Sequence, residues 1–101
     1  MTTKENVIND IENTPVLVYI KGTKESPACR WSAQIVHILD QYEVEYEDRN
    51  VLIDPEIRMS VSEYSDWATI PQLFVKGKFV GGGDIVKELH NQGSLGEVIK
   101  A

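Results

Sequence analysis

The chain of 101 residues contains a single cysteine. One thiol per chain excludes an intrachain disulfide, a two-cysteine redox pair and a metal site built only from the cysteines of one chain. The sequence is also poor in positive charge, with 10 basic against 16 acidic residues and a formal net charge of −6. That balance argues against general binding to nucleic acid or to an acidic lipid surface.

Long apolar runs are absent as well, and none approaches the roughly 20 residues that cross a bilayer. Residues 1–13 lack the apolar core of a secretory signal and the arginine-rich character of a transit peptide. We therefore expect a cytoplasmic protein with no membrane association, although an organellar protein after processing would have the same composition. The length and the 42% apolar content suit one compact domain.

Apolar patterning predicts alternating helices and strands. Residues 15–20 form a continuous apolar run, which is typical of a strand buried on both faces, whereas 44–51 is polar enough for an edge strand. A strand–helix–strand unit implies a parallel pair, and the turn at 76–77 implies an antiparallel hairpin. The expected elements are helices at 2–13, 31–41, from 54, at 84–93 and after 94, and strands at 15–20, 44–51, 73–75 and 78–80. Asp54, followed by Pro55, is the expected N-cap of its helix. This order predicts an α/β fold of the thioredoxin-like type, with a four-stranded mixed sheet flanked by helices.

Cys29 lies in the polar loop between the first strand and the second helix. A sulfur at a helix start faces unpaired backbone N–H groups and the positive end of the helix dipole, which favour the thiolate. Lys21 and Arg30 add positive charge on either side. A lone cysteine can equally be a small buried apolar side chain, an alternative that the polar loop disfavours.

Three other features have both a functional and a structural interpretation. His37 lies off the apolar stripe of its helix, ~12 Å along the axis from Cys29, and is interpreted as a solvated residue rather than a general base. Arg58 is interpreted as half of a surface ion pair with a neighbouring acidic residue. Glycines 81–83 precede Asp84, the expected N-cap of a helix, and their N–H groups either receive an anion such as a carboxylate or simply form a turn.

Six motifs together resemble the monothiol glutaredoxins over nearly the whole chain, so residues 1–101 are expected to form a single domain of that family. They are Lys21-Gly22-Thr23, Cys29-Arg30-Trp31-Ser32, Asn50-Val51-Leu52, Glu56-Ile57-Arg58, Trp67-Ala68-Thr69-Ile70-Pro71-Gln72-Leu73 and Gly81-Gly82-Gly83-Asp84-Ile85-Val86. The chain departs from the family at Arg30, where glycine is usual, and at Gly83, where many relatives carry a second cysteine. We hypothesise that Arg30 lowers the Cys29 pKa further and alters cluster packing or partner contact.

The resemblance implies that glutathione binds beside Cys29, which is the catalytic sulfur. Lys21 and Arg58 would bind the glycine carboxylate of glutathione. The backbone of Ile70, which precedes a cis Pro71, would pair with the cysteine of glutathione.

The resemblance assigns the other end of glutathione to the glycine-rich segment. Gly83 and Asp84 would hold the γ-glutamyl group through N–H groups and the Asp84 carboxylate. Thr69 and Gly82 complete the expected glutathione-binding set.

The resemblance further implies that two chains and two glutathiones hold one [2Fe–2S] cluster. Such a cluster needs four thiolates, and two copies of Cys29 with two glutathione thiols supply four. The expected protein is a cluster carrier, dimeric when loaded and monomeric when free, that serves apo iron–sulfur proteins and has a BolA-like partner. One alternative is an oxidoreductase that removes glutathione from mixed disulfides with Cys29 as nucleophile. Another is an interaction module on the same scaffold without chemistry.

Overall fold

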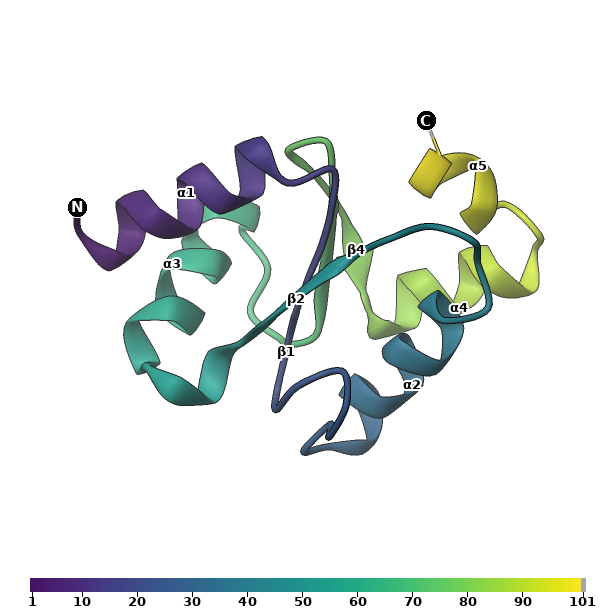
Figure 1. The fold of residues 1–101 in the computed structure, drawn as a ribbon, viewed down its shortest axis with the longest axis horizontal. Coiled ribbons are helices and arrows are strands. Elements are labelled where there is room, and N and C mark those ends of the chain that lie inside the picture. The colour runs from purple at the N-terminus through teal and green to yellow at the C-terminus, as the bar shows by residue number, and fades with distance from the viewer. Residues whose placement is uncertain (101) are drawn as a thin grey trace.

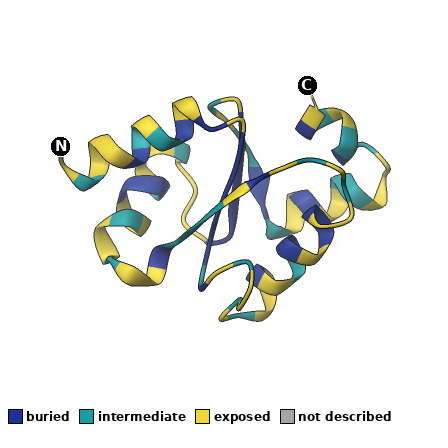
Figure 2. Ribbon diagram, viewed as in Figure 1, coloured by how far each residue is buried: buried dark blue, intermediate teal, exposed yellow. Residues whose placement is uncertain are grey.

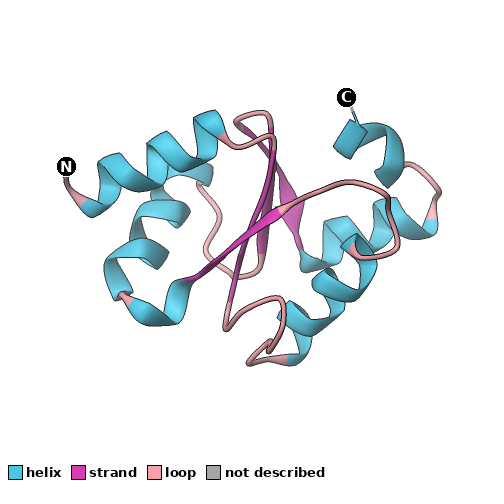
Figure 3. Ribbon diagram, in the orientation of Figure 1, coloured by secondary structure: helices cyan, strands magenta, loops and turns pink. Residues whose placement is uncertain are grey.

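A four-stranded sheet lies between two layers of helices in the computed structural model, which describes residues 1–100 (Figures 1 and 3). The strand order is β2-β1-β3-β4, with β1 parallel to β2 and the other neighbours antiparallel. The elements are α1 (Thr3–Asn13), β1 (Val16–Ile20), α2 (Arg30–Leu39), β2 (Glu47–Asn50), the 3₁₀ helix η1 (Val51–Ile53), α3 (Pro55–Ser65), β3 (Gln72–Val75), β4 (Lys78–Gly82), α4 (Gly83–Asn91) and α5 (Leu95–Lys100). The predicted α/β architecture, with its mixed sheet and flanking helices, is confirmed.

Strand β1 is the centre of the hydrophobic core, and all five of its residues are buried (Figure 2). Val16, Val18 and Ile20 pack toward α2, α4 and α5, whereas Leu17 and Tyr19 pack toward α1 and α3. Successive side chains of a strand point to opposite faces of a sheet. The continuous apolar run in the sequence therefore supplies both halves of the core, and each fully buried aliphatic side chain contributes roughly 1.5–3 kcal/mol.

Strand β2 lies at the edge of the sheet, as predicted, but it is shorter than the expected 44–51. Asn50 ends it because its side-chain Oδ1 accepts a hydrogen bond from the Leu52 backbone N–H at 2.9 Å, which starts the turn of η1. The sequence analysis did not predict η1. Within residues 1–100 no helix has the length and apolar character needed to cross a membrane.

The starts of α3 and α4 test two predicted caps. Asp54 caps α3 by accepting the Glu56 N–H at 3.0 Å, as predicted. The prediction that Asp84 caps α4 is wrong, because β4 continues through Gly82, which pairs with Gln72 and is itself the N-cap. Asp84 lies instead in the first turn of α4, where its negative charge still complements the positive end of the helix.

Candidate functional site

The loop between β1 and α2 folds back on itself and fixes the position of Cys29. Gly22 adopts a φ of +90°, and a Cβ there would lie 2.6 Å from Ser26 O and 2.7 Å from the Ala28 nitrogen. Only glycine fits this backbone without displacement. The Gly22 N–H also donates to Asn50 Oδ1 at 3.0 Å, so the same asparagine that ends β2 anchors the loop. The loop therefore delivers Cys29 to the N-cap position of α2.

Cys29 is partly exposed, so the alternative of a buried apolar cysteine is wrong. Its thiol donates to Ser32 Oγ at 3.3 Å, and the Ser32 backbone N–H donates to Sγ at 3.4 Å. Partial desolvation raises the pKa of Cys29, but hydrogen bonds from the Ser32 hydroxyl and from the N–H groups of Ser32 and Trp31, together with the charge of Lys21, outweigh it and lower the pKa. When the thiol loses its proton, the Ser32 hydroxyl becomes the donor. The predicted activation of the thiol is confirmed.

The groups that mainly lower the Cys29 pKa are Ser32, Trp31 and Lys21, and the expectation that Arg30 lowers it further stays a prediction. The guanidinium carbon of Arg30 lies over the Trp31 ring, 5.4 Å from the ring centroid, and the residue is exposed. The side chain therefore packs along its own aromatic neighbour instead of against the sulfur.

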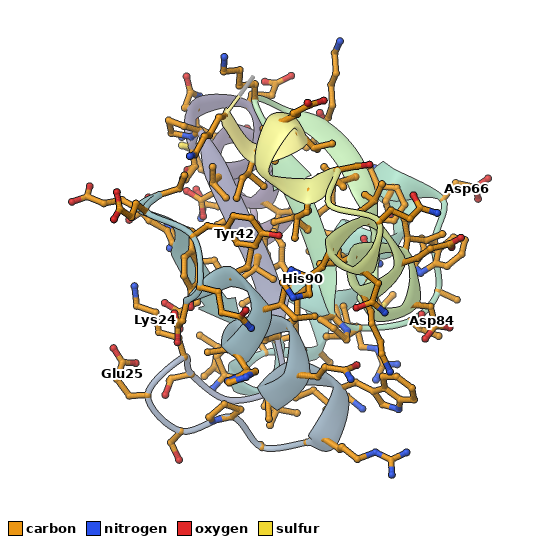
Figure 4. All side chains as sticks on the ribbon, turned by 90° about the vertical axis from the view of Figure 1, so that its right-hand side faces the viewer. Lys24, Glu25, Tyr42, Asp66, Asp84 and His90 are labelled. Atoms are coloured by element: carbon orange, nitrogen blue, oxygen red, sulfur yellow. The ribbon has the colours of Figure 1, made fainter. Side chains whose placement is uncertain are left out.

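A groove with a volume of about 310 Å³ lies beside the start of α2. That volume is at the small end of the range for ligand pockets, about 300–1,000 Å³. Its lining residues are Trp31, Trp67, Thr69, Ile70, Pro71, Gly82, Gly83 and Asp84. The structure thus brings together all six residues that the sequence analysis assigned to glutathione at 69–71 and 82–84. The Ile70–Pro71 peptide bond is cis, as expected, and Figure 4 shows Asp84 at the start of α4.

Two glycines shape this groove in different ways. A Cβ at Gly82 would lie 2.8 Å from Trp67 Nε1, so the absence of a side chain lets the indole pack against β4. A Cβ at Gly83 would lie 3.6 Å from Pro71 and 3.7 Å from Trp31, which are ordinary contact distances. A methyl group at Gly83 would therefore fit in contact with Pro71 and Trp31 without a clash.

Gln72 holds the wall of the groove in place. Its side chain has no solvent exposure, and Nε2 donates to the backbone carbonyls of Trp67 at 2.9 Å and Thr69 at 3.1 Å. The sequence analysis assigned roles to neither Gln72 nor Ser32, although each stands in a quoted motif. The sequence signal for Ser32 is its place three residues after the N-cap Cys29, because the backbone N–H at that place faces the cap side chain.

Lys21 and Arg58 do not line the groove. Lys21 is close enough to influence the sulfur, and its backbone N–H donates to Ser32 Oγ at 3.0 Å. Arg58 is exposed on α3 and has no recorded contact with Cys29 or Lys21. Its interpretation as half of a surface ion pair is wrong, because over residues 1–100 it forms none, and the nearby Glu63 pairs with Lys4 at 3.2 Å.

Comparison with known proteins places the chain in a family. The profile described as Glutaredoxin matches residues 16–80. The chain is 43% identical over 97 residues to "Monothiol glutaredoxin-S15, mitochondrial" of Arabidopsis thaliana, covering 96% of this chain and 57% of that protein. It is 46% identical over 96 residues to "Probable monothiol glutaredoxin 2" of Rickettsia felis, covering 95% and 92%.

Solved structures give the same result. A monomeric truncated mutant of Trypanosoma brucei 1-C-Grx1 superimposes with a TM-score of 0.87 at 37% identity, covering 99% of this chain and 91% of that one. Reduced poplar apo GrxS14 superimposes with a TM-score of 0.83 at 35% identity, covering 96% and 89%. With its thioredoxin-like fold and its lone cysteine at a helix start, the chain belongs to the glutaredoxin family and is of the monothiol type.

Proposed function

We propose that the groove binds glutathione and that the chain is a glutathione-dependent carrier of [2Fe–2S] clusters. The observation that carries this proposal is the single activated sulfur, which is partly exposed, lies within reach of the Lys21 charge, and stands two residues before Trp31 in the wall of the groove. Glutathione has two carboxylates and an ammonium group. Over residues 1–100 neither Lys21 nor Arg58 forms an ion pair. Two such cations complement a carboxylate, which supports assigning them to the glycine end of glutathione.

The start of α4 supports the assignment of the γ-glutamyl end. Its N-cap is Gly82, which makes no side-chain cap hydrogen bond, so the first N–H groups of this helix are not used by a cap. Such groups bind carboxylates well. Gly83 and Asp84 line the groove, and the exposed Asp84 carboxylate complements an ammonium group. In this proposal the backbones of Thr69 and Ile70 meet the cysteine of glutathione.

The cluster is the cargo, and its donor set decides the stoichiometry. A [2Fe–2S] cluster takes four thiolates, and the chain has one cysteine. Over residues 1–100, no three His, Cys, Asp or Glu side chains lie together as a metal site. Two Cys29 thiolates and two glutathione thiolates complete the set, so the loaded form is a homodimer and the free form a monomer. The single soft donor, already held toward its thiolate form, fits this role.

The same proposal includes the partners and the location. Recipients are apo iron–sulfur proteins, and a BolA-like protein is a further partner. A cytoplasmic location is also proposed. The relatives include plant proteins named as mitochondrial and bacterial proteins, so fractionation of the native source is the direct test of location.

A second function is favoured by the lowered pKa of Cys29 and its exposure. In it, the Cys29 thiolate attacks the glutathione sulfur of a protein–glutathione disulfide, which forms a Cys29–glutathione disulfide and releases the protein thiolate. A second glutathione thiolate then attacks that disulfide, restores Cys29 and leaves as oxidised glutathione.

Anaerobic reconstitution with iron, sulfide and glutathione separates the two functions. A carrier yields a coloured dimer with one cluster per two chains and two glutathiones, measured by visible absorbance, iron and sulfide content and native mass. Cys29→Ser should yield none, and Lys21→Gln should weaken glutathione binding whereas Lys78→Gln, a matched charge loss at the far end of β4, should not. A colourless monomer that turns over glutathione mixed disulfides would support the oxidoreductase instead.

A further inference from the structure

The first turn of α2 differs from that of every other α-helix in residues 1–100. A negative charge near a helix N-terminus is stabilising and a positive charge is not. Acidic residues occupy the first turns of α1, α3, α4 and α5, namely Glu5, Glu56, Asp84 and Glu97. Helix α2 has no acidic residue there, and it begins with Arg30. The stability of α2 therefore does not explain why an arginine stands at this position.

Within residues 1–100 Arg30 has no acidic partner, although the protein has 16 acidic residues. In the part of the chain that the structure describes, its side chain forms no ion pair and no hydrogen bond. The guanidinium carbon is 5.4 Å from the centroid of the Trp31 ring, and Trp31 lines the groove. A guanidinium has five N–H donors and no acceptor. Arg30 thus presents unused donors at the rim of the site, directly after Cys29 in the chain.

The other cations assigned to this site already have roles, and Arg30 has none. Lys21 lowers the pKa of Cys29, and with Arg58 it is assigned to a carboxylate of glutathione. The lowering of the Cys29 pKa comes mainly from Ser32, Trp31 and Lys21. The net charge of −6 repels acidic partners at long range. Electrostatic attraction of an acidic partner must therefore come from a cation that touches the partner directly.

We propose that Arg30 is a specificity-determining residue that favours protein partners with acidic side chains beside the sulfur that meets Cys29. The proposal rests on the proposed function and names the chemistry of the partner at that same site. A guanidinium held along an aromatic ring suits two parallel hydrogen bonds to one carboxylate, a geometry that lysine lacks. A partner with basic residues beside its sulfur meets like charge instead.

The test uses short peptides whose only cysteine is joined by a disulfide to thionitrobenzoate. The three peptides are identical except that the cysteine is flanked by aspartates, alanines or lysines. The Cys29 thiolate attacks the peptide sulfur, a Cys29–peptide disulfide forms, the original disulfide breaks, and the electron pair leaves with coloured thionitrobenzoate. The measured quantity is the ratio of second-order rate constants for the aspartate and lysine peptides. No glutathione is needed, so this ratio is independent of cluster binding.

At low salt we expect Arg30→Gln to lower the ratio of the aspartate to the lysine rate constant about two- to fivefold relative to Lys78→Gln, the range for an exposed ion pair. The two variants have the same net charge, so the long-range repulsion of the aspartate peptide is the same in both. Arg30→Lys should lower the ratio less than Arg30→Gln, and the difference between Arg30→Gln and Lys78→Gln should disappear in ~1 M salt. Equal ratios in Arg30→Gln and Lys78→Gln at low salt, or an equal effect of Arg30→Gln on all three peptides, would overturn the proposal. If cluster assembly fails but the ratio of rate constants still depends on Arg30, the carrier function is refuted and the proposed selectivity for acidic partners stands.

Discussion

Replacing Ser32 by alanine tests how the fold activates the cysteine. The Ser32 hydroxyl lies 3.3 Å from Cys29 Sγ and also accepts the Lys21 N–H at 3.0 Å. Partial burial raises the pKa of Cys29, and the Ser32 hydroxyl is the largest of the groups that lower it. Ser32 is fully buried, so water does not readily replace the lost hydroxyl. The variant should therefore have a higher Cys29 pKa and a lower stability.

The size of both effects follows from the contacts. A hydrogen bond to a charged group contributes about 1.5–3 kcal/mol, but sulfur is a weak acceptor and Cys29 is partly exposed, so we take about 1 kcal/mol. That free energy corresponds to up to about a fivefold loss of thiolate near neutral pH. The unpaired Lys21 N–H should cost a further ~1–3 kcal/mol of unfolding free energy.

The assay is the pH dependence of alkylation of Cys29 by iodoacetamide, with urea unfolding for stability. Ser65→Ala is a matched control, because its hydroxyl donates to the Val61 carbonyl in α3 at 3.1 Å and does not reach Cys29. It should leave the Cys29 pKa unchanged. An unchanged or lower pKa in Ser32→Ala, in a protein that remains folded, would refute the assignment of thiolate stabilisation to this hydroxyl.

Three further perturbations have defined outcomes. Gly82→Ala places a Cβ 2.8 Å from Trp67 Nε1, so it should displace the indole and weaken glutathione binding in calorimetry; unchanged affinity and tryptophan fluorescence would contradict this. Gln72→Ala removes two hydrogen bonds to the Trp67 and Thr69 carbonyls and should lower the free energy of unfolding by about 2 kcal/mol or more in urea; a change below about 0.5 kcal/mol would contradict it. Because the native pKa of Cys29 is lowered, the native state releases its thiol proton before the unfolded state does. The wild type should gain unfolding free energy relative to Cys29→Ser as pH rises from the native pKa to about 8.5 and lose it as pH falls; a flat difference would be inconsistent with thiolate stabilisation.

The sequence predicted the architecture well because its strongest signals are local. Residues 16–20 form an apolar run that only a strand buried on both faces satisfies, and each face of β1 packs against a different helix layer. The cap at Asp54 is equally local, because it needs one side chain and the backbone next to it. The cap predicted at Asp84 failed for a reason outside its own segment. Pairing of Gly82 with Gln72 in the neighbouring strand extends β4 and moves the helix start.

The candidate site shows the same division between local and long-range information. The position of Cys29 at a helix start was readable from its segment, but the groove joins the 67–71 loop, the end of β4 and α2, which only the folded chain brings together. The direction of the Arg30 side chain cannot be predicted from the sequence, because adjacency to Cys29 does not fix where a long side chain points. Its contact with the Trp31 ring decides that direction.

Titration of the reduced protein with glutathione, followed by amide NMR shifts, tests the central claim most directly. The account predicts that the largest shifts fall on Cys29, Ile70, Gly83 and Asp84, and that Arg58→Gln weakens the apparent affinity without moving the site. Shifts confined to other surfaces, or no saturable shifts at all, would contradict the claim that this groove and this sulfur form a glutathione site.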